Sequence, residues 1–357
     1  MNKMDIIKKL LEQNKADAII LHSPENRYWF SRFHSSMGYL IITKKQSYLF
    51  LDGRYITAAK NQKDLQNIDH IKHFGKSVWE EMNNVLKNEN IQNIAFESDW
   101  IIYKQYLGFK NAFINQKLIP VDCSGMRMVK DQWEIEQIQK ACDITDQVFQ
   151  TVLKFVKPGI TEKELARFVS DQFFAFGADK LSFDTIIASG INGSMPHAVP
   201  TDKKLALGEL ITLDMGCFYN GYCSDQTRTF ALGEIKDAKL LDIYNTVFEA
   251  QSLGISLVKA GQNAGFIHNE VAKFIAQKGY EGYFDHGLGH GIGVEIHEEP
   301  YENAISKSIL TKNMTITVEP GIYIPGVGGV RIEDDILVTE NGYEMLTSSP
   351  RKLIIVK

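Results

Sequence analysis

Four carboxylates and one histidine in the last two-fifths of the chain have the types and surroundings to do chemistry. They are Asp214, Asp225, His290, Glu319 and Glu333. Each lies in an apolar, strand-like segment or in a glycine-rich turn. A buried anion must be paired or bound to metal, because burying it alone costs more free energy than folding supplies. Two divalent cations would balance the four acids, so the sequence predicts a dinuclear metal site.

The ligand types indicate the metal and the reaction. Mostly oxygen ligands with one imidazole suit Mn²⁺, Co²⁺, Zn²⁺ or Fe²⁺, and the oxygen majority favours Mn²⁺. Two such ions that share a water generate hydroxide near neutral pH and polarise a carbonyl, so hydrolysis of an amide is the natural reaction. Taken singly, ordinary interpretations stay open: Asp225 fits a surface strand, Glu319 before Pro320 fits a turn, and His290 fits a flexible loop.

A hairpin positions the first two acids. Asp214 interrupts an apolar strand pattern, and Asn220-Gly221 is the strongest two-residue hairpin signal. If these two residues form the turn, Asp214 faces Thr227 and Asp225 faces Gly216. The two acids are then diagonal neighbours on one face, with Cβ atoms about 7 Å apart, which is a bridging distance for metal ions.

The second pair of acids is placed in the same way. Glu319 and Glu333 are centred on Gly326, within the turn-like run 325–329, so a hairpin would set them opposite each other. The glycines of this run permit several registers, and the register stays open.

A diffuse internal repeat connects the two acid pairs. Residues 156–169 and 258–275 share a Val-Lys-Xaa-Gly turn before an apolar helix, and each is followed by a histidine and a hairpin with two acids. The spacing of about 100 residues indicates one duplicated α+β unit. Two such halves facing each other would bring all four acids to a common centre.

Length and composition bound the class of protein. A chain of 357 residues, 44% of them hydrophobic, favours two globular domains. The net charge of −5 gives no sign of a nucleic-acid or anionic-membrane partner. No apolar run approaches the roughly 18 residues of a membrane span, and the start reads as an amphipathic helix. Four irregularly spaced cysteines suggest reduced thiols in a cytoplasmic protein.

The first 124 residues alternate strand-like and helical stretches, so residues 1–124 are expected to form a small α/β domain. Its predicted elements are strands at 16–21, 38–42, 47–51 and 94–96 and a helix at 78–86. The pattern breaks at Ser124-Gly125, and residues 125–357 are expected to form the second domain. A long helix from Trp133 opens it, and Thr161 with Glu164 caps the next helix.

The order of these motifs resembles that of the pita-bread metallopeptidases, family M24. The matching motifs are Asp214-Met215-Gly216, Asp225-Gln226-Thr227-Arg228, His286-Gly287-Leu288-Gly289-His290-Gly291, Glu319-Pro320-Gly321 and Arg331-Ile332-Glu333-Asp334. Within the family, the chain is most similar to the Xaa-Pro aminopeptidases and Xaa-Pro dipeptidases (prolidases). Residues 1–124 resemble the N-terminal domain of creatinase and prolidase, although Ser31-Arg32-Phe33 departs from the Thr-Gly-Phe often found there.

The resemblance implies a role for each ligand. Asp214 would bind one metal, Asp225 and Glu333 would bridge the two ions, and His290 with Glu319 would complete the other. Glu319 would also exchange a proton with the attacking water and the leaving amine.

The resemblance also implies residues that face the substrate. His197 and His297 would contact it and stabilise the tetrahedral oxyanion. His286 would help to form the pocket for the residue after the cut. Arg331 would border the substrate and orient the ligand acids.

The implied function is a dinuclear-metal exopeptidase that cuts the bond between an N-terminal residue and a following proline, as a homodimer. Whether it is an aminopeptidase or a dipeptidase stays open. A methionine aminopeptidase-like enzyme is one alternative, although such relatives usually lack a domain like residues 1–124. A creatinase-like, metal-free amidinohydrolase and a non-catalytic pita-bread binding module are others. Both typically lose ligand residues, and here none is lost.

Overall fold

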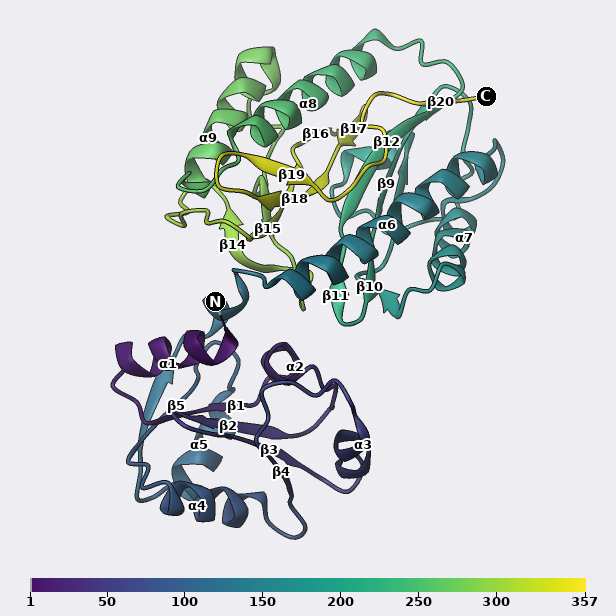
Figure 1. Cartoon of the computed structure of the whole chain (residues 1–357). Coiled ribbons are helices and arrows are strands. Elements are labelled where there is room, and N and C mark those ends of the chain that lie inside the picture. The colour runs from purple at the N-terminus through teal and green to yellow at the C-terminus, as the bar shows by residue number, and fades with distance from the viewer. Residues whose placement is uncertain (1) are drawn as a thin grey trace. The chain divides into compact units, whose positions relative to one another are not determined.

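The computed structural model describes residues 2–357 and divides into two compact units, one ending at Arg127 and one spanning Met128–Lys357 (Figure 1). The two units are considered one at a time. No helix within residues 2–357 combines the length and the apolar character that a membrane crossing requires.

The first unit is built on a six-stranded mixed sheet in the order β4-β3-β2-β1-β5-β6. Strands β1, β2 and β3 are buried along their whole length, which explains their continuous apolar sequence. The strands are β1 (Ala18–Leu21), β2 (Tyr39–Thr43), β3 (Ser47–Leu51), β4 (His70–His73), β5 (Asn93–Glu97) and β6 (Lys117–Val121).

Within residues 2–127, five helices accompany this sheet. They are α1 (Lys3–Gln13), α2 (Pro24–Ser31), α3 (Ile56–Asn61), α4 (Val78–Asn88) and α5 (Tyr103–Ala112). The predicted helix at 78–86 and all four predicted strands are confirmed. Helices α2, α3 and α5 and strands β4 and β6 were not predicted. In α2 the buried face includes the polar residues Asn26 and Arg27. The sequence therefore lacks the apolar stripe that would predict a helix here.

The second unit begins with two helices, α6 (Gln132–Phe155) and α7 (Glu162–Ala175). Helix α6 begins at the predicted point, one residue before Trp133, and a capping box of Asp131 and Glu134 closes its first turn. The predicted box of Thr161 and Glu164 caps α7. Both helices pack on a four-stranded sheet of order β20-β12-β9-β8. The strands of this half are β7 (Lys180–Leu181), β8 (Ile186–Ser189), β9 (Glu209–Met215), β10 (Cys217–Tyr219), β11 (Tyr222–Cys223), β12 (Gln226–Leu232) and β20 (Ile355–Val356).

A second helix pair, α8 (Ala238–Leu257) and α9 (Ala264–Ile275), packs in the same way on the following strands. Their sheet has the order β14-β13-β15-β18-β19, and β16 and β17 form a separate ribbon. The strands are β13 (Gly289–Gly291), β14 (Glu298–Glu302), β15 (Thr315–Val318), β16 (Gly321–Ile324), β17 (Gly328–Arg331), β18 (Asp334–Val338) and β19 (Tyr343–Met345). The unit is therefore a duplicated helix-pair and hairpin arrangement, as the internal repeat predicts.

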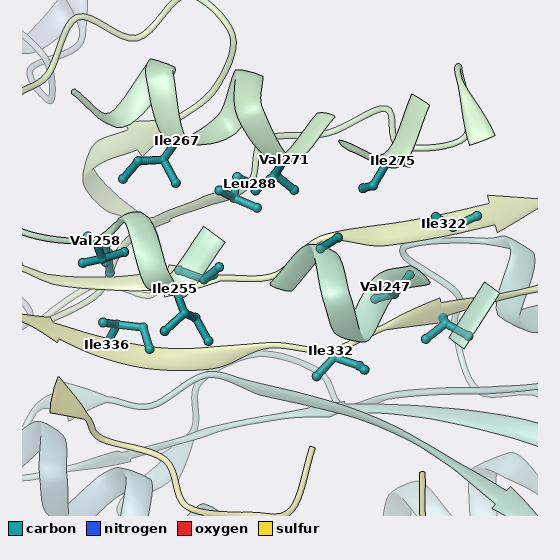
Figure 2. Close-up of a cluster of buried hydrophobic side chains, with 14 of the residues drawn as sticks. Val247, Ile255, Val258, Ile267, Val271, Ile275, Leu288, Ile322, Ile332 and Ile336 are labelled. Atoms are coloured by element: carbon teal, nitrogen blue, oxygen red, sulfur yellow. The ribbon is translucent and has the colours of Figure 1, made fainter. Parts of the chain in front are cut away.

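A hydrophobic core packs the helices of this second half against its strands. In Figure 2, Ile267, Val271 and Ile275 of α9 lie across from Ile322 and Ile336 of the strands. All five side chains are essentially inaccessible to solvent. Burial of each side chain contributes about 1.5–3 kcal/mol to folding. This packing therefore stabilises the strands that carry the acids.

Candidate metal centre and active site

The first hairpin has the register that the Asn220-Gly221 turn predicts. Asp214 pairs with Thr227 in the antiparallel β9–β12 ladder, and the same register continues into β10 and β11. Asn220 and Gly221 have φ values of 45° and 73°, the left-handed backbone that a tight hairpin turn needs. Asp225 lies just before β12. Both acids line one cavity.

The second hairpin resolves the register that the glycines left open. Val318 pairs with Asp334 where β15 ends, and Gly321 pairs with Arg331 where β16 begins, so both ladders are centred on Gly326. Glu319 and Glu333 therefore lie opposite each other at the break between the two ladders. Gly326 has φ 76°, which a glycine adopts without strain.

The two hairpins bring their acids around His290. Single ligand atoms of Asp225, His290 and Glu333 lie within 4.8 Å of one another. His290 Nε2 is 3.7 Å from Asp225 Oδ2 and 3.4 Å from Glu319 Oε1. Asp214 borders the same cavity, and Arg331 Nη2 donates to its Oδ2 at 2.7 Å.

The orientation of His290 favours a cation beside it. Its Nδ1 is 3.1 Å from the carbonyl oxygen of Gly291, which can only accept, so Nδ1 carries the proton of the neutral ring. Burial lowers the pKa of His290 to about 4, which keeps the ring neutral at pH 7. The unprotonated Nε2 then directs its lone pair at two carboxylates, which repel it. A metal ion between them would be bound by the nitrogen and by both carboxylates.

The buried carboxylates also favour a bound cation. Burial, reinforced by the neighbouring acids, raises the pKa of Asp225 and of Glu333 well above the usual range, and burial raises that of Glu319 to about 8. Asp214 Oδ1 and Glu333 Oε1 are buried without a hydrogen-bond partner. A divalent cation would coordinate these unpaired carboxylate oxygens and offset the repulsion between the neighbouring acids. These residues therefore fit a metal centre.

Arg331 organises the centre from one side. Its side chain is 4% exposed, Nε donates to Thr227 Oγ1 at 3.0 Å, and Nη2 holds Asp214. Thr227 in turn donates to Glu333 Oε2 at 2.7 Å. One arginine thus orients an acid from each hairpin, and it offsets part of their charge.

The remaining predicted residues line the same cavity, whose volume is about 470 Å³. The rings of His290 and His297 are 4.4 Å apart. His197 follows Pro196, whose carbonyl oxygen accepts from Arg331 Nη1 at 3.2 Å. His286 is partly buried, its loss of solvation lowers its pKa to about 4, and its Nε2 is 3.1 Å from the hydroxyl of Tyr323. Every site residue predicted from the sequence therefore borders one cavity of the second unit.

Two residues of this centre were not predicted from the sequence. Tyr323 accepts from Arg331 Nη1 at 2.9 Å and so connects that arginine with His286. Asp335, which is fully buried, accepts the backbone N–H of Asp225 at 2.8 Å. Tyr323 is two residues beyond Gly321 on the second hairpin, a spacing that could have placed it on the site face. Nothing in the sequence connects Asp335 with Asp225.

Comparison with known proteins identifies the family of both units. Residues 136–340 match metallopeptidase family M24, and residues 3–129 match the creatinase/prolidase N-terminal domain. An Xaa-Pro dipeptidase of Pyrococcus furiosus is 35% identical over 99% of this chain and 99% of its own length.

Solved structures agree as well. An Xaa-Pro dipeptidase from Bacillus anthracis has a TM-score of 0.94 at 38% identity, covering 99% of both chains. An X-Pro aminopeptidase from Thermotoga maritima MSB8 has a TM-score of 0.90 at 32% identity, covering 98% of this chain and 100% of the other. The predicted fold, a pita-bread unit preceded by a creatinase-like domain, is confirmed. The chain belongs to metallopeptidase family M24 and carries a creatinase/prolidase N-terminal domain.

Proposed function

We propose that this metallopeptidase uses two divalent ions, with Mn²⁺ favoured over Co²⁺, Zn²⁺ and Fe²⁺, to remove an N-terminal residue that precedes proline. The observation that carries the proposal is the convergence of an acid-rich donor set and three further histidines in one cavity. The preference for proline rests on the relatives, whose names include both Xaa-Pro dipeptidase and X-Pro aminopeptidase.

Asp214, Asp225, His290, Glu319 and Glu333 would hold the metal. The charge balance supports two ions: Arg331 offsets one of the four carboxylates, and a single divalent ion would still leave a buried net negative charge. When bound, such ions activate a water for attack and polarise the substrate carbonyl.

The protein groups around the metal would move protons and orient the peptide. Glu319 would take a proton from the attacking water and return it to the leaving amine, a role that suits a carboxylate whose pKa burial has raised. His197 and His297 would donate N–H groups to the developing oxyanion. His286 and Arg331 would border the residue after the cut, held in place by Tyr323.

A metal-loading experiment tests these assignments. Protein stripped with EDTA is loaded with Mn²⁺, the bound ions are counted by mass spectrometry, and peptides that differ only in Pro or Ala at the second position are compared. We expect two ions per chain and cleavage of the proline peptide at least about tenfold faster, the order of one specific pocket contact. Equal cleavage of the alanine peptide would remove the claim of proline specificity.

The alternative activities are not favoured. Relatives that align over nearly the whole chain, including the N-terminal domain, have Xaa-Pro names. A Met-Gly-Xaa peptide tests the methionine aminopeptidase alternative, which requires that this peptide be the better substrate. Failure to bind any divalent ion would favour a metal-free amidinohydrolase or a binding module.

We also propose that residues 125–357 form the catalytic domain and residues 1–124 a separate domain that gates the substrate, within a cytoplasmic homodimer. The four cysteines are free and buried, which agrees with a reducing compartment. Light scattering of the purified protein tests the dimer, and a mass equal to one chain would exclude it.

A further inference from the structure

His197 lies on a loop, residues 190–200, that forms one wall of the cavity. The loop begins where β8 ends at Ser189, and its residues 196–200 line the cavity. The side chain of His197 is exposed. The position of its ring therefore depends mainly on how the backbone of the loop is held.

Glu162, the first residue of α7, binds both ends of this loop. Its side chain is 0% exposed. Oε1 accepts the backbone N–H and the hydroxyl of Ser189 at 2.9 and 2.7 Å. Oε2 accepts the backbone N–H and the hydroxyl of Thr201 at 3.0 and 2.6 Å. The side-chain amide of Asn192 donates to both oxygens at 3.1 and 3.2 Å, so one carboxylate holds the two ends of the loop together.

The charge of Glu162 strengthens these contacts. Burial raises the pKa of its carboxyl group, but the hydrogen bonds from Thr201 and Ser189 lower it by more, so its pKa lies below the ordinary value. The N-terminus of α7 also favours a negative charge at this position. Hydrogen bonds to an ionised acceptor are about twice as strong as those between neutral groups. The anion is therefore suited to fix the loop.

The middle of the loop lies against β17, next to the candidate metal centre. A β-carbon on Gly193 would lie 3.1 Å from the backbone nitrogen of Gly329, so the two backbones pack closely. Arg331 Nη1 donates to the carbonyl oxygen of Pro196, the residue before His197, at 3.2 Å. With its ends fixed by Glu162 and its middle against β17, the loop has little freedom to move His197.

We propose that Glu162 is a positioning residue for the reaction, which acts by holding loop 190–200 in the conformation that keeps His197 beside the metal centre. The inference rests on the proposed function, in which His197 donates to the oxyanion. Within residues 2–357, Glu162 is not part of the cavity lining, so its effect must pass through the loop. A displacement of about 1 Å in a reacting geometry can cost about a hundredfold in rate.

Glu162→Gln tests the proposal in the Mn²⁺-loaded protein. Glutamine keeps the size, but its NH₂ group would face the donors at one end of the loop. We expect kcat to fall about tenfold to a hundredfold, with KM and the calorimetric affinity for Mn²⁺ nearly unchanged. Glu164→Gln is the matched control, because Glu164 is an exposed acid in the same helical turn, and it should behave as the wild type. Equal kcat in Glu162→Gln and Glu164→Gln would overturn the proposal.

A double-mutant cycle with His197→Ala separates positioning from a general structural effect. If Glu162 acts through His197, Glu162→Gln should lower kcat by less than about threefold once His197 is removed. The same fold-loss in both backgrounds would overturn the proposal.

Amide hydrogen exchange on the metal-free protein provides a test that needs no activity. Residues 190–200 should exchange at least about tenfold faster in Glu162→Gln than in the wild type, while the β9–β12 ladder keeps its protection. Unchanged exchange in the loop would refute the role of Glu162. Absence of peptide cleavage by the wild type would instead refute the proposed function.

A milder pair of variants covers the case in which Glu162→Gln fails to fold. Thr201 is exposed, so its replacement should be tolerated. Thr201→Val removes the hydroxyl that donates to Glu162, and Thr201→Ser keeps it. Valine should lower kcat about fivefold, the worth of one hydrogen bond, and serine should restore it. Equal kcat in these two variants would contradict the proposal.

Discussion

Replacing Glu302 by glutamine is expected to stabilise the protein at alkaline pH and to leave its stability nearly unchanged below pH 5. Glu302 is the last residue of β14, its side chain is 0% exposed, and neither carboxylate oxygen has a hydrogen-bond partner. Burial, with a smaller contribution from Glu319, raises the pKa of Glu302 to about 8. The folded protein therefore holds a neutral acid here near pH 7.

The sign and size of the effect follow from proton linkage. The unfolded chain releases this proton near 4.5 and the folded chain near 8, so the folded state binds more protons between these values, and stability falls as pH rises through that window. At ~1.4 kcal/mol for each pH unit, the full loss is about 5 kcal/mol. Glutamine keeps the shape but cannot ionise. For a folding unit the size of residues 128–357, the variant should therefore have a Tm about 10 °C above that of the wild type at pH 9.

Thermal unfolding from pH 5 to pH 9 in EDTA measures this difference. Glu299→Gln is the matched control, since Glu299 is on the same strand but only partly buried, and it should change the curve little. Bound metal would neutralise Glu319 and reduce the difference, so the Mn²⁺-loaded protein should show a smaller gap. Parallel stability curves for Glu302→Gln and the wild type would refute the reasoning.

Three further outcomes are expected. Asp225→Asn and Glu333→Ala should abolish peptidase activity yet leave the metal-free Tm equal or higher, because each removes a repelling charge; measurable turnover in either would contradict their assigned role. Arg331→Lys should weaken Mn²⁺ binding in calorimetric titrations by about tenfold to a hundredfold, since lysine cannot hold Asp214 and Thr227 in one geometry. Tyr323→Phe should lower kcat by about fivefold, the worth of one hydrogen bond, with little change in metal stoichiometry; unaltered kcat would exclude a positioning role.

The candidate ligand set and half of its geometry were predictable because local chemistry determines them. A two-residue Asn-Gly turn admits one register, and that register places Asp214 opposite Thr227 whatever the rest of the chain does. The apolar runs of β1, β2 and β3 mark buried strands in the same local way. These features need no knowledge of distant residues.

The elements that escaped prediction lack such local signals. Strand β4 has the sequence His-Ile-Lys-His and is only partly buried, so it has no apolar run. The second hairpin has several glycines that permit more than one register. The β15–β18 ladder, which is part of the five-stranded sheet, selects one of them, and the β16–β17 ribbon continues that register.

By itself, the sequence identified the candidate metal ligands and the duplicated α+β unit that carries them, because ligand types and turn residues are properties of short segments. Only the tertiary structure showed that Arg331 donates hydrogen bonds to Asp214, Thr227 and Tyr323. It alone also showed that the Glu302 carboxyl group is buried without a hydrogen-bond partner. These facts depend on contacts between residues up to 117 positions apart, and on burial that packing alone creates.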